Sequence, residues 1–347
     1  MNSPISGIVV TGYSAVTAAG IGIAAIQDLL RTGCGALAPI PGDVLGRDGL
    51  RWGKVDGFKA SDFMPPMKAR KMDRCSQFAV AVAGLALKDA GIDLKQLPPE
   101  RVGIALGSGF CGVSNSAEFL TGYFTGGVEG LIPMIFPNTV PNSPASNASI
   151  EHGFKGPNVT LVQRFCSAES AFMMACRFIE EGRADIMLAG GADELIPLII
   201  KGFDVMGQMT PASAPFGEGC GIIVLERAAH AARRGAAVKA AVEAITTIGM
   251  LAAGHESDGL DRLAGPADSC SHVSLSGTAA DMPALLERVS SRSVTDIGQT
   301  VGRSLAMGGT AMAVLLASLQ SEQAGLHVAA SPDGPYYAIR FKGGAPV

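Results

Sequence analysis

Short apolar runs alternate with stretches of helical spacing along the first two thirds of the chain. Buried strands are predicted at residues 7–14, 101–109, 158–163 and 184–194, and at the start of 219–235. Helices are predicted at 76–91 and 168–182, each ending in a glycine, and at the end of 219–235. Strands that alternate with helices are typical of a layered α/β fold with helices on both faces of a sheet.

The pattern starts again after residue 235. The sequence predicts strands at 239–251, 271–277, 325–332 and 335–341, a helix at 281–292, and a glycine turn leading into a buried Ala-rich helix within 295–320. Residues 252–270 are polar and rich in glycine, and we expect a surface loop there. Each half holds one helix of small residues, at 171–181 and 309–319, that can pack tightly between sheets. We therefore expect a duplicated unit with halves at 1–235 and 236–347.

Composition narrows the class of protein. Apolar residues make up 48% of the 347 residues and charged residues 17%, and the net charge is −4. A chain without basic excess is not expected to bind nucleic acid. No apolar run reaches the ~18 residues that span a membrane, and the start shows no signal peptide, so we expect a cytoplasmic globular protein. Seven scattered cysteines without CxxC spacing indicate reduced thiols, and neither a metal nor a cofactor is predicted.

One stretch carries candidate chemistry: "LVQRFCSAESAFMMACRFIEEGRADIMLAGG", residues 161–191. Its pattern predicts a strand, a sharp turn, a buried helix and a second strand, an arrangement that commonly places a nucleophile at the turn. Cys166 stands at that turn beside the bulky Phe165. Either Cys166 is a catalytic thiol, or Phe165 holds the catalytic position.

Several segments together resemble the β-ketoacyl synthases. They are 8–20 "IVVTGYSAVTAAG", 68–93 "KARKMDRCSQFAVAVAGLALKDAGID", 140–161 "VPNSPASNASIEHGFKGPNVTL" and 182–194 "GRADIMLAGGADE". The resemblance is strong over 1–240 and weak over 241–347. It implies an α/β fold of the thiolase-like type, five-layered αβαβα with two pseudo-symmetric halves, of which the C-terminal half is trimmed.

The resemblance also implies where catalytic groups would stand. That family performs decarboxylative condensation with a cysteine that carries the acyl chain, two histidines that bind the malonyl thioester, and a lysine that orders them. Counted from Gly156-Pro157 and from Gly190-Gly191, the cysteine position falls on Phe165. The two histidine positions and the lysine position correspond to Ser276, Arg303 and Gly298. No catalytic residue is therefore predicted, with Cys166 as the fallback nucleophile.

The remaining candidate residues have a structural alternative. Phe165 either fills the core or plugs an acyl tunnel. The basic residues Lys68, Arg70, Lys71 and Arg74 form either a solvated face or the surface that meets acyl carrier protein. All five histidines are expected to lie away from the matched positions, in structural or exposed places: His152, His230, His255, His272 and His327.

A ketosynthase-like chain without these groups resembles the chain-length-factor subunits of type II polyketide and aryl-polyene systems. We therefore predict a non-catalytic subunit that pairs with an active ketosynthase as a heterodimer in fatty-acid or polyketide chain elongation. Residues 122–137 and 158–163 are expected at the dimer interface. Two alternatives stay open: a divergent condensing or acyl-transfer enzyme using Cys166, and an acyl-binding homodimer without a ketosynthase partner. No membrane partner is expected.

Overall fold

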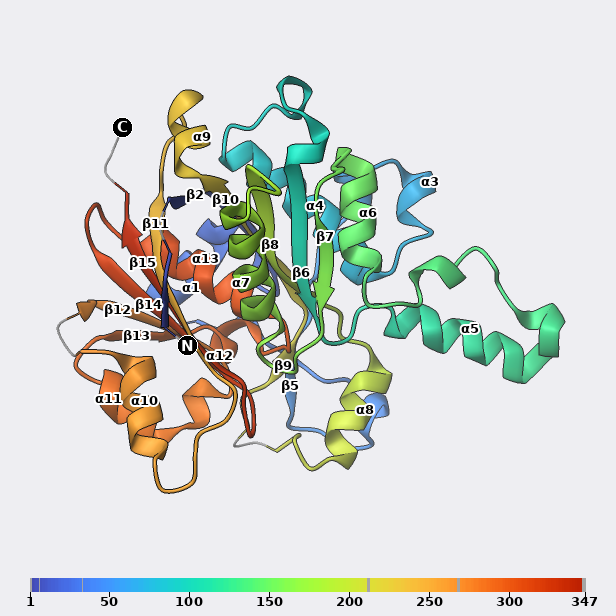
Figure 1. Ribbon diagram of the computed structural model, residues 1–347. Helices are drawn as coiled ribbons and strands as arrows, with labels where there is room; N and C mark the ends of the chain where they lie inside the picture. The colour runs from blue at the N-terminus through green and yellow to red at the C-terminus, as the bar shows by residue number, and fades with distance from the viewer. Residues whose placement is uncertain (1, 6, 33, 211–212, 267–268, 345–347) are drawn as a thin grey trace.

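The computed structural model describes residues 2–5, 7–32, 34–210, 213–266 and 269–344 (Figure 1). The first set of main strands is β2 (Ile8–Thr17), β6 (Val102–Ser108), β7 (Asn158–Leu161), β8 (Ile186–Asp193) and β10 (Gly219–Arg227). The second set is β11 (Ala240–Ile248), β12 (His272–Gly277), β13 (Ser293–Asp296), β14 (Ala324–Ala330) and β15 (Tyr336–Gly343).

The two sets of strands have the same order. The first runs β7-β6-β8-β10-β2 across the sheet, and the second runs β13-β12-β14-β15-β11, so in each set the spatial order is third, second, fourth, fifth, first. In both sets the first three strands in this order run parallel to one another, and each of the last two is antiparallel to the strand before it. The sets join where β11 pairs with β2 at Ala240 and Ala241. This repeat supports the duplication, while the boundary at residue 235 stays a prediction.

The fold has five layers, which can be recognised from the apolar faces of its helices and strands. The central layer holds α7 (Ser167–Glu180) and α13 (Gly308–Ser318), whose side chains share one core with the inner faces of both strand sets. Along β8, Met187 and Ala189 face that core while Leu188 faces a second core under α4 (Arg74–Asp89) and α6 (Ser143–His152). The outer face of the second set packs against α10 (Glu256–Ala264) and α11 (Pro283–Val289). The fold is thus the thiolase-like αβαβα sandwich that the sequence predicts.

Small residues allow the central helix α13 to lie directly on the sheet. A Cβ atom on Gly309 would lie 2.2 Å from the carbonyl oxygen of Gly221 in β10. A Cβ on Gly221 would in turn lie 2.2 Å from the backbone nitrogen of Thr310. Any side chain at these positions would push helix and sheet apart.

The polar stretch 252–270 is not a loop throughout, so that prediction is wrong. Residues 256–264 form α10, and Leu260, Leu263 and Ala264 bury its inner face against the second strand set. These three residues have the i, i+3, i+4 spacing of an amphipathic helix, but the glycines and polar residues around them favoured the loop interpretation.

The remaining strands and α-helices of the described residues connect and flank these elements. They are β1 (Asn2–Pro4), β3 (Gly20–Ile21), α1 (Ile23–Thr32), β4 (Ala38–Pro39), α2 (Gly42–Leu45), β5 (Arg51–Gly53), α3 (Pro66–Ala69), α8 (Pro197–Val205), β9 (Phe216–Gly217), α9 (Ala228–Arg233) and α12 (Gly298–Val301). Among the described residues, no helix combines the length and the apolar character that crossing a membrane requires.

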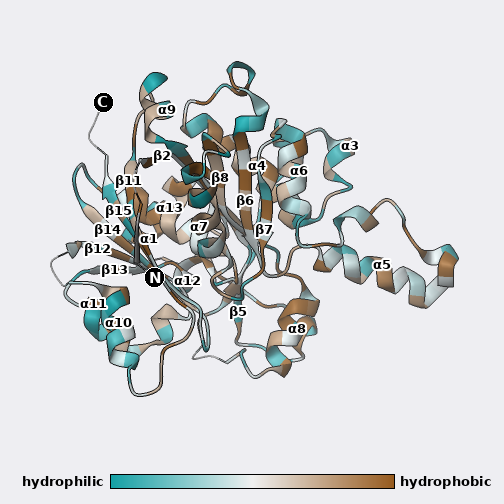
Figure 2. Ribbon diagram, in the orientation of Figure 1, coloured by the Kyte–Doolittle hydropathy of each residue, from teal (hydrophilic) through white to brown (hydrophobic). Residues whose placement is uncertain are grey.

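One segment projects from the body of the molecule (Figure 1). It consists of α5 (Val113–Gly126), the 3-10 turns Gly127–Gly130 and Phe136–Asn138, and the chain up to Val140, and we call it the arm. Within the arm, the backbone at Gly122 packs directly against the backbone at Gly130, because a Cβ on Gly122 would lie 2.1 Å from the oxygen of Gly130. Apolar segments continue onto the arm (Figure 2). Its exposed apolar side chains are Leu120, Tyr123, Phe124, Val128, Ile132, Met134, Phe136 and Val140.

Candidate functional site at the turn before α7

The turn from Gln163 to Ser167 has a defined local structure. Arg164 adopts φ 51°, a left-handed conformation that is uncommon outside glycine. The Ser167 hydroxyl donates to the Arg164 carbonyl at 2.8 Å and accepts from the Gln163 N–H at 2.9 Å. Helix α7 begins at Ser167 with Cys166 as its N-cap residue. Phe165 therefore lies at the tip of the turn, between the strained residue and the helix.

The side chain of Phe165 fills an apolar cavity together with Arg303. Phe165 is 8% exposed and belongs to a cluster that also holds Leu195, Ile199, Ile200, Phe203 and Phe216. The guanidinium carbon of Arg303 lies 5.8 Å from the ring centroid of Phe165 and 4.8 Å from that of Phe216. Arg303 also forms an ion pair with Asp281 at 3.1 Å.

The structure brings all four matched positions together. Gly298 opens α12, and a Cβ there would lie 3.5 Å from the Cβ of Arg303. Gly277 follows Ser276, and its Cβ would lie 2.9 Å from the Cβ of Phe165. Phe165, Ser276, Gly298 and Arg303 thus surround one place, although neither a thiol nor an imidazole points into it from these positions.

A buried polar cluster lies beneath this place, and the sequence did not reveal it. The Ser276 hydroxyl donates to Glu169 Oε1 at 2.5 Å, and His327 Nε2 contacts the same oxygen at 2.8 Å and Ser276 Oγ at 3.3 Å. His327 Nδ1 bonds Ser274 Oγ at 2.8 Å. The expectation that every histidine lies away from the matched positions is therefore wrong for His327. The available signals were a glutamate within an apolar helix and a histidine within an apolar strand.

The cluster depends on strand register and on one glycine. Ser274 and His327 are direct partners across the parallel pair β12–β14, so their side chains share the inner face of the sheet. Glu169 reaches them from the first turn of α7, across the central layer. A Cβ on Gly308, where α13 begins, would lie 1.9 Å from Glu169 Oε1, so only glycine leaves room for the carboxylate.

Cys166 points inward, away from any open surface. Its side chain is fully buried, and its thiol donates to the carbonyl oxygen of Pro335 at 3.2 Å. Burial, and secondarily the negative charge of Glu169, raises the pKa of the Cys166 thiol far above its usual range. Tyr337 closes the same corner, because its hydroxyl donates to Gln163 at 2.9 Å. Since the thiolate is the nucleophile in cysteine chemistry, this environment does not activate Cys166.

Comparison with known proteins agrees with this geometry. The family model described as "Beta-ketoacyl synthase, N-terminal domain" matches residues 6–231. The chain belongs to the β-ketoacyl synthase family. It is 33% identical over 207 residues to a 3-oxoacyl-[acyl-carrier-protein] synthase 2 of Vibrio cholerae, covering 55% of this chain and 50% of that relative. It is 32% identical over 265 residues to a granaticin polyketide putative beta-ketoacyl synthase 1 of Streptomyces violaceoruber, covering 69% and 63%. The chain thus spans about half the length of the first relative and less than two thirds of the second.

Solved structures of ketosynthases share the whole fold. The ishigamide ketosynthase/chain length factor superposes with a TM-score of 0.84 at 23% identity, over 98% of this chain and 100% of that chain. AntDE:AntF, a type II ketosynthase in complex with its acyl carrier protein, gives a TM-score of 0.81 at 20% identity, over 97% and 99%. At these identities the likeness shows the thiolase-like fold.

The basic residues of this β-ketoacyl synthase family member do not form one surface. Lys68, Arg70 and Lys71 are exposed, and Lys68 pairs with Glu151 at 2.7 Å. Arg74 instead points inward, where its Nε lies 2.8 Å from the buried carboxylate of Glu218 and its guanidinium stacks on Phe78. The expectation of Arg74 as part of a solvent-facing basic patch is therefore wrong, because it neutralises a buried acid.

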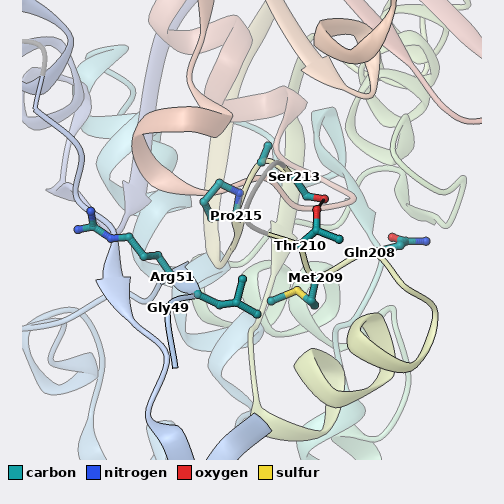
Figure 3. Close-up of a pocket in the computed structure, with 9 residues that line it drawn as sticks. Gly49, Arg51, Gln208, Met209, Thr210, Ser213 and Pro215 are labelled. Carbon is teal, nitrogen blue, oxygen red and sulfur yellow. Dashed lines mark hydrogen bonds between the residues drawn. The ribbon is translucent and has the colours of Figure 1, made fainter. Parts of the chain in front are cut away.

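A small cavity of about 130 Å³ lies at the edge of the site (Figure 3). It lies between the chain at Gly49–Arg51 and residues that include Met209, Thr210 and Pro215. The Pro215 carbonyl accepts the backbone N–H of Arg303 at 2.7 Å, which places the cavity next to the Phe165–Arg303 contact. The hydroxyls of Thr210 and Ser213 bond each other at 2.7 Å. Among the described residues, its lining holds two hydroxyls but no thiol, imidazole or carboxylate, and so no general base that could activate those hydroxyls.

Proposed function

We propose that this β-ketoacyl synthase family member is a non-catalytic, chain-length-factor-like subunit. It pairs with an active β-ketoacyl synthase and acts in fatty-acid or polyketide chain elongation. One observation carries the proposal: a buried Phe165, with the guanidinium of Arg303 5.8 Å from its ring centroid, occupies the tip of the turn before α7. A phenyl ring can neither take an acyl chain as a thioester nor leave room for one.

Loss of the charge-stabilising groups supports the same function. Condensation needs donors that stabilise the enolate formed when CO₂ leaves, and removal of one such donor typically costs on the order of 10²–10³ in rate. Of the residues at the two histidine positions, Ser276 is turned to Glu169, and Arg303 is held by Asp281 and two aromatic rings. A single substitution would not restore the site.

The enzyme alternative, with Cys166 as nucleophile, is disfavoured by the position of that thiol. Cys166 is fully buried and bonded to Pro335, and it would have to move out of the core before it could meet an acyl thioester. The raised pKa of Cys166 would keep it protonated at neutral pH.

Two surfaces fit the pairing. The arm presents apolar side chains that a monomer would leave in water, among them Phe124 and Phe136. Strand β7 ends the sheet and pairs only with β6 among the described strands, and the following Val162 is exposed. An exposed apolar patch beside a free strand edge is typical of an interface between proteins. The exposed Lys68, Arg70 and Lys71 remain the proposed contact for acyl carrier protein.

The test is a reconstituted condensation assay with the chain, an intact β-ketoacyl synthase, acyl carrier protein and malonyl groups. We expect no product from the chain alone. In the pair, Cys166→Ala in this chain should leave product formation unchanged, and replacement of the cysteine nucleophile of the partner synthase should abolish it. Loss of product with Cys166→Ala, in a variant that still pairs, would favour the enzyme alternative. If the chain forms a stable dimer with itself and does not bind the synthase, the homodimer alternative would be favoured.

A further inference from the structure

Three metal-ligating side chains meet in the core, away from the site before α7, and a second buried thiol, Cys111, lies near them. Asp73 and Cys75 lie at the start of α4, Cys111 lies in the turn between β6 and α5, and Glu194 directly follows β8. All four are buried. One ligand atom each from Asp73, Cys75 and Glu194 lies within 4.8 Å of the other two. The Cys111 thiol lies outside this group and donates to the carbonyl oxygen of Ala192 at 3.1 Å.

The two carboxylates already have supporting donors. Asp73 accepts the backbone N–H groups of Ser76 at 2.9 Å and Gly112 at 2.7 Å. Glu194 accepts both the N–H and the hydroxyl of Ser114 at 2.8 Å. Each carboxylate oxygen thus accepts one hydrogen bond and keeps a lone pair free. Donors of this kind typically orient the carboxylates that bind a metal.

Asp73 and Glu194 have no cationic partner among the described residues. By contrast, Glu218 contacts Lys54 and Arg74, and Glu226 contacts Arg234 and His230. Buried Asp193 also lacks a cationic partner among the described residues, and it accepts the N–H groups of Gly109, Phe110 and Ala306. Asp73 and Glu194, however, face each other within a few ångströms. Two carboxylates so near each other in a buried site must either share a proton or be neutralised by a cation.

We propose that Asp73, Cys75 and Glu194 bind one divalent transition-metal ion of the zinc class. One thiolate and two carboxylates suit Zn²⁺, which takes sulfur and oxygen ligands at a tetrahedral site with one position left for water, and they suit Mg²⁺ or Ca²⁺ poorly, because these ions prefer oxygen. On binding, the Cys75 thiol loses its proton to solvent and its sulfur forms a bond to the metal. One oxygen of each carboxylate also bonds the metal, and a carboxyl group that holds a proton releases it to solvent.

The ion would connect segments that are far apart in the sequence. It would tie the start of α4 to the end of β8 (Figure 1). Because Asp73 accepts the N–H of Gly112 and Glu194 accepts that of Ser114, the same ion would hold the first residues of the arm through these carboxylates. The sequence concealed this arrangement, because Glu194 meets Asp73 and Cys75 only in the folded chain.

The test is Co²⁺ binding by the reduced full-length chain after treatment with a chelator. We expect one Co²⁺ per chain after dialysis, with the near-ultraviolet sulfur-to-cobalt band and the visible bands of a tetrahedral site, all removed by added Zn²⁺. Cys75→Ser should lose the sulfur band and the bound ion. Cys176→Ser, which removes another buried thiol on α7, should keep both.

Three outcomes would overturn the proposal: no retained metal in the wild-type chain, metal retained equally by Cys75→Ser, or octahedral spectra without the sulfur band. The second and third would indicate adventitious surface binding, and the first a proton shared by Asp73 and Glu194. If Cys75→Ser does not fold, Glu194→Gln provides the second variant. Zn²⁺ should raise the Tm of the wild type and leave the Tm of Glu194→Gln unchanged, and an equal rise in both would contradict the site.

Discussion

The guanidinium carbon of Arg303 lies 5.8 Å from the ring centroid of Phe165, so two residues at positions matched to catalytic groups pack against each other. A cation over an aromatic face is favourable by ~0.5–2 kcal/mol, more when water is excluded. In the proposed function, this pair fills the place where an active synthase would hold its acyl thioester.

Removing the Phe165 ring should therefore destabilise the protein. Because the ring is nearly buried among Leu195, Phe203 and Phe216, Phe165→Ala should cost roughly 3–5 kcal/mol in the free energy of unfolding, by denaturant titration. The matched control is Phe124→Ala on the arm, where the ring is 79% exposed and a change within about 0.5 kcal/mol is expected. Equal costs for the two variants would show that Phe165 is not packed as described.

Cys166 should resist alkylation across the useful pH range. Only the thiolate reacts, and burial raises the pKa of Cys166, so its labelling by iodoacetamide should stay slow as the pH rises from 7 to about 9. The exposed Cys34 is the internal control and should label readily in the same sample, as peptide mass spectrometry would show. Stoichiometric modification of Cys166 in the folded protein at neutral pH would contradict its place in the core.

The Glu169–His327 contact should be important for stability. His327→Ala removes the partner of a fully buried carboxylate, and breaking a buried pair typically costs about 3–5 kcal/mol. His255→Ala is the control, since the His255–Asp258 pair is exposed and should contribute less than ~1 kcal/mol. Thermal and denaturant unfolding of both variants would measure these free energies of unfolding. A small loss of stability for His327→Ala would mean that Glu169 finds another partner.

Gly308 should tolerate no side chain, for the same reason. Its Cβ would lie 1.9 Å from Glu169 Oε1, so Gly308→Ala must displace the carboxylate or the start of α13. We expect a clear fall in Tm. Gly202→Ala in α8, where a Cβ meets nothing within 4 Å, should leave the Tm unchanged or slightly higher. A normal Tm for Gly308→Ala would contradict this close contact.

A charge on the arm should prevent pairing. Phe124→Asp places a carboxylate on the apolar face of the arm and should abolish co-elution with an intact β-ketoacyl synthase in size-exclusion chromatography with light scattering. Val205→Asp, at an 89% exposed apolar position on α8, should pair like the wild type. If Phe124→Asp pairs normally, the interface lies elsewhere.

The sequence predicted most of the fold because the relevant signals are local. Apolar runs marked the strands, and small residues such as Gly309 marked the helices of the central layer. Phe165 could be placed because glycines on both sides fix its register. Contacts between distant elements could not be predicted: Glu169 and His327 meet through the packing of α7 on β14, and Arg74 turns toward Glu218 rather than solvent. Helix α10 was missed because the many glycines and polar residues of 252–270 outweighed the helical spacing of its three apolar residues.

The proposed non-catalytic function requires that this chain carries no acyl group. The direct measurement is the intact mass of the folded chain after incubation with an acyl-loaded acyl carrier protein, beside an intact β-ketoacyl synthase as positive control. We predict that the synthase gains the mass of the acyl group and that this chain gains none. A gain of one acyl group by this chain, lost in Cys166→Ser, would contradict the account and identify Cys166 as a working nucleophile.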